Sequence, residues 1–216
     1  MGGRIYGQAP RDCGLVDLQP TEMMFWQDLF IKPAKQFEPV LPANLQQFGP
    51  LIAAVMRAEG IDRWIDHNVF MCAKTLWVSA AESMNRRGWH TDGFMSSDIN
   101  YVWSDCYGTE IWLADELVSL TQDHAASIDE MTFLAADPFY GSIVTYPDRH
   151  LIRLDETVVH RVAEYPVARM RSFVKVSLSK GYFNRVGNSI NHQLPLPVAY
   201  EARTAERNVP ASKEAA

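Results

Sequence analysis

The chain has 216 residues, a formal net charge of −6 and 47% hydrophobic residues, so it suits one sizeable core, and its mildly acidic surface disfavours duplex nucleic acid as a partner. No apolar stretch approaches the roughly 20 residues that cross a bilayer, and Cys13, Cys72 and Cys106 form neither a CxxC pair nor an even set. We therefore expect a soluble, cytoplasmic protein in a reducing compartment, without membrane contact.

Residues 1–68 are predicted to form an N-terminal cover with one helix. Up to residue 42, aromatic residues alternate with prolines, a pattern that suits short elements packed on a core. In residues 44–59, apolar side chains recur at helical spacing, Pro50 suits a first turn and Gly60 is available as a C-cap. This pattern indicates an amphipathic helix that lies against a sheet.

Short segments rich in β-branched and aromatic residues, separated by turn signals, follow from residue 69 onward. They cover residues 69–80, 99–105, 109–115, 141–147, 150–156 and 171–179. This rhythm is typical of an all-β core, a barrel or jelly roll, and with the helix it predicts a β-rich α+β fold. We assign residues 69–183 to the core, residues 1–200 to a single domain, and the charged, alanine-rich residues 201–216 to a flexible tail.

His90 and Asp92 stand two residues apart in the sequence RRGWHTDGF. In a strand, residues i and i+2 point to the same side, so an imidazole and a carboxylate can converge on one ion. Two histidines and one carboxylate form the iron site of non-haem oxygenases, with further positions open. His160 is our candidate for the second histidine, and these three residues are the predicted metal-binding and catalytic set.

Two histidines compete for that position. Arg171 lies eleven residues after His160, and Arg161 lies eleven residues after His150, so spacing alone does not separate the pairs. Arg171 opens the strand-like sequence RSFVKVSLS, where a guanidinium fork can bind a carboxylate through paired hydrogen bonds. Arg161 lies in HRVAEYP, whose proline indicates a connection. We therefore prefer His160 with Arg171.

The HTD sequence, a histidine about seventy residues later and an arginine on the following strand resemble the 2-oxoglutarate/Fe(II) oxygenase superfamily over residues 69–191. The run HRVAEYPVARMRSFVKVSLSKGYFNRVGNSINH is similar to the C-terminal half of small members, which pair a distal HR with an R-[ST]-F-x-[KR]-[VI]-S strand and a later GNS. The resemblance implies a double-stranded β-helix, a jelly-roll or cupin-like fold, and the strand rhythm agrees with it.

The resemblance also implies a function. The predicted metal-binding set would hold Fe(II), and Arg171 would bind the far carboxylate of the cosubstrate 2-oxoglutarate. With O2, the cosubstrate would be decarboxylated to succinate while a substrate C–H bond is oxidised, by default hydroxylated. Some members have a serine two residues after this arginine, whereas this chain has Phe173, so Thr109 and Tyr101 are our candidates for the second cosubstrate contact.

The sequence does not identify the substrate or the oligomeric state. The excess of acidic over basic residues favours a small molecule or a peptidyl side chain as the substrate.

Two other classes of protein stay open. A cupin-like metalloenzyme would use iron or another divalent ion without 2-oxoglutarate and keep Arg171 as a structural residue. A non-catalytic β-sandwich interaction module would bind no metal, and His90 and Asp92 would fix a turn.

Overall fold

The computed structural model describes residues 4–20 and 22–203. Strands predominate in these ranges, and helices are few. In chain order the elements are β1 (Arg11–Leu15), β2 (Met24–Lys32), η1 (Ala43–Phe48), α1 (Gly49–Glu59), α2 (Ile61–Asp66), β3 (Asn68–Val78), β4 (Ile99–Ser104), β5 (Glu110–Ala114), α3 (His124–Ala136), β6 (Gly141–Thr145), β7 (His150–Leu154), β8 (His160–Arg161) and β9 (Arg169–Ser179).

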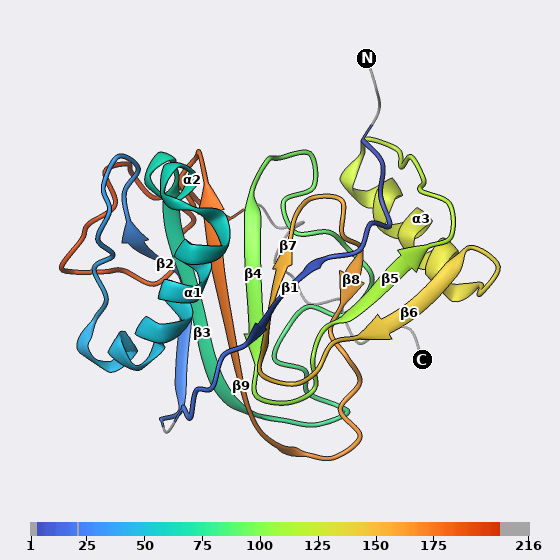
Figure 1. Cartoon of the computed structure of the whole chain (residues 1–216), viewed down its shortest axis with the longest axis horizontal. Coiled ribbons are helices and arrows are strands. Elements are labelled where there is room, and N and C mark those ends of the chain that lie inside the picture. The colour runs from blue at the N-terminus through green and yellow to red at the C-terminus, as the bar shows by residue number, and fades with distance from the viewer. Residues whose placement is uncertain (1–3, 21, 204–216) are drawn as a thin grey trace.

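The strands form two antiparallel sheets (Figure 1). The larger sheet has six strands in the order β1-β7-β4-β9-β3-β2, and the smaller has three in the order β6-β5-β8. β9 lies between β3 and β4 and pairs with β3 along its whole length. The prediction of a β-rich core is confirmed, and each strand predicted from residue 69 onward agrees with an observed strand to within two residues at either end.

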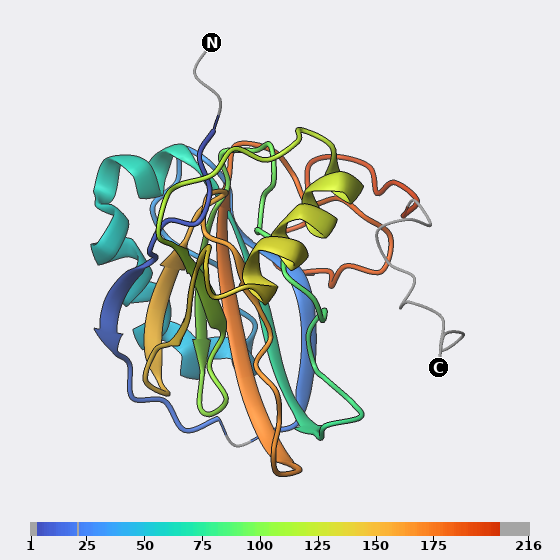
Figure 2. The ribbon, with the colours of Figure 1, turned by 90° about the vertical axis from the view of Figure 1, so that its right-hand side faces the viewer.

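One side of the larger sheet, here called the outer face, packs against helices. Ala73, Val174 and Trp103 are aligned across β3, β9 and β4, and they belong to a buried apolar cluster that includes Leu51 and Val55 of α1. Figure 2 shows α1 and α2 together on this side of the sheet. The apolar stripe of α1 therefore has the partner that the sequence predicted.

The predicted helix over residues 44–59 divides into two. Residues 43–48 form the 3-10 helix η1, and α1 begins at Gly49, with Pro50 in its first turn. α1 ends at Gly60, whose φ of +80° falls in the left-handed region that favours glycine. The proline in the first turn and the C-cap at Gly60 are thus as predicted, whereas residues 44–48 belong to the separate 3-10 helix.

The opposite side of the larger sheet, the inner face, packs against the smaller sheet. Val102, Ile152 and Phe173 of the larger sheet form a buried cluster with Ile111 of β5 and Val158, just before β8. This cluster holds the two sheets face to face. The candidate site lies beside it, between the sheets.

α3 covers the other side of the smaller sheet. Trp112 of β5 and Met131 of α3 share a buried cluster with Tyr6 and Val159. The carboxylate of Asp123 caps the helix by accepting hydrogen bonds from two N–H groups of the first turn, those of residues 125 and 126. The sequence analysis assigned no element to residues 124–136, so α3 is an addition to the predicted fold.

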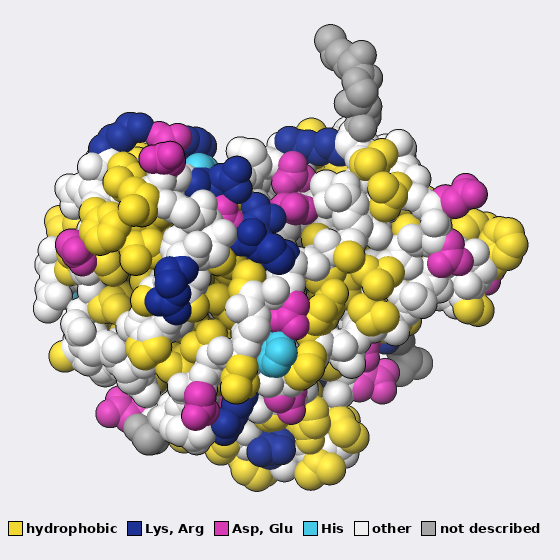
Figure 3. Space-filling model, viewed as in Figure 1, with side chains coloured by type: hydrophobic (Ala, Val, Ile, Leu, Met, Phe, Trp, Pro, Cys, Tyr) yellow, Lys and Arg dark blue, Asp and Glu magenta, His cyan; other side chains and the backbone are white. Residues whose placement is uncertain are grey.

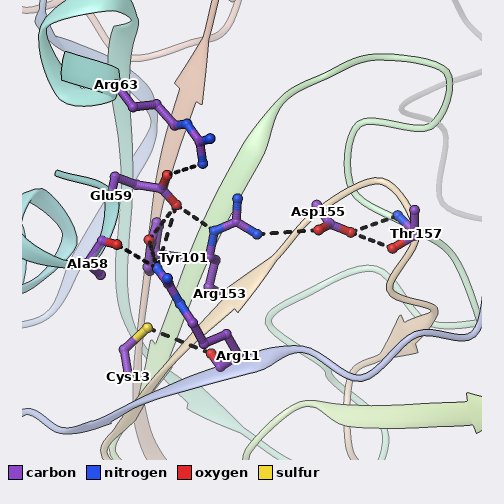
Figure 4. Close-up of polar contacts among 9 residues, drawn as sticks. All are labelled: Arg11, Cys13, Ala58, Glu59, Arg63, Tyr101, Arg153, Asp155 and Thr157. Atoms are coloured by element: carbon purple, nitrogen blue, oxygen red, sulfur yellow. Dashed lines mark hydrogen bonds and ion pairs between the residues drawn. The ribbon is translucent and has the colours of Figure 1, made fainter.

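A buried carboxylate fastens α1 to the outer face (Figure 4). The Glu59 side chain is 1% exposed and accepts hydrogen bonds from Arg153 at 2.5 Å, the Tyr101 hydroxyl at 2.6 Å and Arg63 at 2.8 Å, while Arg11 lies 3.8 Å away. Burial raises the pKa of Glu59, but these hydrogen bonds outweigh it and leave the pKa below its ordinary value. Figure 3 shows basic and acidic side chains gathered side by side on this face.

Residues 201–203 of the predicted tail are described, and they are attached to the preceding loop. The N–H of Glu201 donates to the carbonyl of Asn184, and its carboxylate lies 2.6 Å from Arg185. Residues 204–216, the rest of that prediction, lie outside the described residues. Among the described helices, none has the length and apolar character required to span a membrane.

Candidate metal centre

His90, in the segment after β3, and His160, in β8, are paired through the backbone. The N–H of His90 donates to the carbonyl of His160 at 3.0 Å, and the reverse bond is 2.8 Å. Residues directly opposite in such a pair share a face, and their ring centroids lie 4.6 Å apart. Asp92 brings its carboxylate to the same place, so that ligand atoms of all three residues lie within 4.8 Å of one another. The structure thus brings together the predicted metal-binding set.

Main-chain carbonyls orient both imidazoles. Nδ1 of His90 lies 2.8 Å from the carbonyl oxygen of Gly88, and Nδ1 of His160 lies 3.0 Å from that of Val158. Because a carbonyl oxygen only accepts, we assign the proton of each ring to Nδ1, which leaves Nε2 with a free lone pair. An imidazole held in this way through its other nitrogen is the usual form of a metal ligand.

The charge states also suit a metal. Burial, reinforced by the neighbouring His160, lowers the pKa of His90 to about 4, so this ring is neutral at pH 7. Burial raises the pKa of Asp92, but the charge of Lys175, 3.5 Å away, and the two histidines outweigh it and hold the pKa well below its usual range. The three residues together offer two imidazole nitrogens and one anionic oxygen to a divalent cation.

These residues line a cavity of about 200 Å³ between the two sheets. Its walls are partly apolar, but they also carry several cations, and Asp92 is the one carboxylate among the described residues that line it. The other lining residues are Gln27, Cys72, Lys74, Met84, Asn85, Arg86, Val102, Thr109, Arg161, Val162, Phe173 and Lys175.

A set of two histidines and one carboxylate suits Fe(II), since three ligands leave further positions of an octahedral ion open for other molecules. Comparisons with known proteins do not assign the chain to a family. A scan against protein-family models finds no match, and a search of curated proteins finds none either. The residues of the site are therefore what indicates a function.

Arg171, the predicted cosubstrate residue, stands on the inner face of β9, two positions before Phe173, and does not line the cavity itself. Its Nε and Nη2 donate to the carbonyls of Cys106 and Tyr107 at 2.9 and 3.0 Å. Its Nη1 lies 3.4 Å from Sδ of Met84, a residue of the cavity wall. Arg171 is 1% exposed, so two main-chain acceptors fix a buried guanidinium whose third nitrogen faces a thioether.

The two candidates for the second cosubstrate contact are placed differently. Thr109 lines the cavity. Tyr101 faces the outer side of the larger sheet, where its hydroxyl binds Glu59 (Figure 4). Because successive residues of a strand point to opposite faces, its neighbour Val102 takes the place in the cavity wall. The structure leaves Tyr101 out of the site, and we do not keep it as a cosubstrate contact.

The competing pair, His150 and Arg161, is also separated. His150 lies on β7 with Nδ1 2.8 Å from the carboxylate of Asp12, outside the group that could hold a metal. Arg161 lines the cavity but binds Glu110 at 2.6 Å. Of the two histidines, His160 is the one that the structure places with His90 and Asp92.

Two cations of the site, Lys74 on β3 and Lys175 on β9, were not predicted from the sequence. Both line the cavity, and the register of the sheet explains why: Phe173 is opposite Lys74, and Cys72 is opposite Lys175. Alternation along RSFVKVSLS offered a signal, since it places Lys175 on the same face as Arg171.

Proposed function

We propose that the protein is a non-haem Fe(II)- and 2-oxoglutarate-dependent oxygenase that oxidises, by default hydroxylates, a C–H bond of a second substrate. The observation that carries the proposal is the convergence of His90, Asp92 and His160 with both Nδ1 atoms held by carbonyls. Bound iron and cosubstrate would supply O2 activation, with release of succinate and CO2. The chain's own part is to hold these groups, position the C–H bond and exclude water.

The proposal includes a double-stranded β-helix, and the order of the strands supports it. From β3 onward, the chain alternates between the sheets: β3 in the larger, the His90 segment beside β8 in the smaller, β4 in the larger and β5 in the smaller. The rest of the chain alternates in the same way: β6 lies in the smaller sheet, β7 in the larger, β8 in the smaller and β9 in the larger. Two adjacent runs of chain that wind together in this way give an eight-stranded jelly roll.

Arg171 supports the 2-oxoglutarate part of the proposal. A thioether sulfur is a weak hydrogen-bond acceptor, so the bond from Nη1 to Met84 is easily exchanged for a stronger one. A carboxylate in the cavity would offer a charge-assisted hydrogen bond in its place. The bonds to Cys106 and Tyr107 would keep the guanidinium fixed during this exchange. Met84, with its flexible side chain, is the residue that would move.

One observation favours a second candidate, a metalloenzyme that does not use 2-oxoglutarate. Two of the three guanidinium nitrogens of Arg171 already bind main-chain carbonyls, as they would in a residue with a purely structural role. Such an enzyme would bind iron through the same three ligands. It would not respond to 2-oxoglutarate.

The test is an anaerobic titration of the metal-free protein with Fe(II) and then 2-oxoglutarate, followed by the visible charge-transfer band. We expect the band in the wild type and its loss in His160→Ala. His150→Ala is the matched control and should keep the band, because His150 lies outside the metal-binding group. Iron binding without a band would support the second candidate, and a wild type that binds no iron would refute both.

Arg171→Ala tests the cosubstrate contact in the same titration. We expect at least a tenfold higher half-saturating concentration of 2-oxoglutarate, since one charge-assisted hydrogen bond is lost. Arg169→Ala removes an exposed arginine from the same strand and serves as the control. Equal 2-oxoglutarate requirements in both variants would show that Arg171 is structural.

A further inference from the structure

The inner face of β9 carries two cations, one on either side of Phe173. Arg171, Phe173 and Lys175 alternate with buried residues of the outer face, so all three point toward the smaller sheet. Four residues of strand separate the two cations by about 13 Å along the backbone. Arg171 and Lys175 therefore serve different parts of the space between the sheets.

Lys74 stands next to this row on β3. It is aligned with Phe173 on one side and with Phe25 of β2 on the other. Its ammonium lies 5.1 Å from the centre of the Phe25 ring, and the residue is half-buried in the cavity wall. Asp28, a nearby acid, already accepts hydrogen bonds from Gln27 and Cys72.

The cations that line the cavity outnumber the carboxylates that line it. Arg161 is paired with Glu110, and Lys175 is paired with Asp92, which a bound metal would share. No carboxylate among the described residues lies within ion-pair distance of Lys74 or Arg86, which also line the cavity. An unpaired ammonium in a partly buried cavity is costly unless a ligand supplies the opposite charge.

Iron and 2-oxoglutarate do not remove this imbalance. Their charges, two positive and two negative, cancel each other, and Asp92 balances one lysine. Burial lowers the pKa of the Lys74 ammonium, and the charge of nearby Asp28 offsets this only in part, so Lys74 still lacks a full counter-charge on the cavity side. A second anion is the simplest group to neutralise it, and the small volume of about 200 Å³ suits a small molecule more than a polymer.

We propose that the substrate of this site is a small molecule with an oxyanion group, a carboxylate or a phosphate, that Lys74 binds with the help of Lys175. The reaction at this site rests on the proposed function, whereas the anion binding does not. Gln27 and Asn85 also line the cavity and offer neutral hydrogen-bonding groups to the rest of such a molecule.

Calorimetric titration with two probes, acetate and methylphosphonate, tests the anion site in metal-free protein. We expect the wild type to bind at least one probe, and Lys74→Gln to bind it at least tenfold more weakly. The preferred probe assigns the oxyanion to a carboxylic acid or to a phosphate ester. Lys74→Arg should keep binding, which separates loss of charge from loss of fold. Lys180→Gln, at an exposed lysine directly after β9, is the matched control and should bind like the wild type.

A second arm separates the substrate site from the cosubstrate site. The titration is repeated on protein loaded anaerobically with Fe(II) and 2-oxoglutarate, where the proposal expects the probe to bind with unchanged affinity. Competition between probe and 2-oxoglutarate would overturn the proposal, because Lys74 would then serve the cosubstrate. Equal binding by the wild type and Lys74→Gln, or no binding by the wild type, would overturn it too. Failure of the proposed function would instead appear as a missing charge-transfer band, with probe binding to metal-free protein intact.

Discussion

The two faces of the larger sheet differ in how their charged side chains are paired. On the outer face, Arg11, Arg63 and Arg153 surround the buried carboxylate of Glu59, and Tyr101 adds a hydroxyl donor (Figure 4). On the inner face, Lys74 has no carboxylate partner among the described residues, and the partner of Lys175 is a candidate metal ligand. Different strands of one sheet provide the two arrangements: β1, β4 and β7 contribute to the outer set, whereas Lys74 and Lys175 stand on β3 and β9.

This difference separates stability from function. A buried charge is tolerated when hydrogen bonds and opposite charges satisfy it, and Glu59 meets that condition within the chain. The inner face meets it only when ligands are added, because its histidines keep free lone pairs and more cations than carboxylates line its cavity. The outer face should therefore control the free energy of unfolding, and the inner face should control the binding of metal and anions.

The largest effect that tests this comparison is expected from Glu59→Gln. The substitution leaves the cations of the outer face without their carboxylate, and breaking a buried ion pair costs about 3 kcal/mol or more. Urea unfolding of the metal-free protein should show this loss, while the half-saturating Fe(II) and 2-oxoglutarate concentrations stay unchanged. Glu116→Gln, at an exposed glutamate, is the control and should stay within about 0.5 kcal/mol of the wild type. Weakened iron binding in Glu59→Gln would break the comparison.

The pH dependence of stability should give a smaller effect that belongs to the inner face. The folded-state pKa of His90, about 4, lies below its ordinary value of 6.5, so the unfolded chain takes up the proton first. The stability that His90 contributes is therefore present above pH 6.5 and is lost as the pH falls toward 4. Glu59 and Asp92 have lowered pKa values, and their contributions are lost only below about pH 4.5.

Between pH 6.5 and 4.5, metal-free wild-type protein should thus lose about 2 kcal/mol of stability through His90. His90→Gln lacks the titrating ring, and its stability should fall by that much less over the same interval. Urea unfolding at a series of pH values measures both curves. Parallel curves for the two proteins would show that burial does not hold His90 neutral.

Much of the β core follows from local pattern. Strands such as β4 and β9 are dense in β-branched and aromatic residues, and α1 has a proline at its start and a glycine after its end. The residues of β2 do not alternate regularly between buried and exposed, because its pairing with β3 shifts register twice and Asp28 takes a φ of +44°. β8 has only two residues, too few for any periodic signal, and long-range pairing with β5 defines it.

The candidate site was predictable where its residues are linked by short spacing. His90 and Asp92 follow from the HTD sequence, and the spacing of eleven residues to an arginine singled out His160, followed by Arg171, and His150, followed by Arg161. Local pattern favoured His160, because Arg171 opens a strand-like sequence, and the pairing of His160 with the His90 segment is the long-range contact that brings it to the site. Lys74 and Lys175 were missed because a charged residue in a strand usually faces solvent, whereas here a second sheet covers that face.

The smallest expected effects separate Tyr101 from Thr109, which the sequence analysis placed in one role. Tyr101→Phe removes a hydrogen bond to the carboxylate of Glu59 and should cost about 1.5 kcal/mol of stability, with no change in the 2-oxoglutarate requirement. Thr109→Val keeps the shape of a residue in the cavity wall and removes its hydroxyl. If that hydroxyl binds the cosubstrate, the half-saturating 2-oxoglutarate concentration should rise about fivefold at unchanged stability, as expected for one hydrogen bond of about 1 kcal/mol. Urea unfolding and the anaerobic titration give both quantities for each variant. A raised 2-oxoglutarate requirement in Tyr101→Phe would mean that a residue of the outer face affects cosubstrate binding. The separation of stability and binding between the two faces would then be wrong.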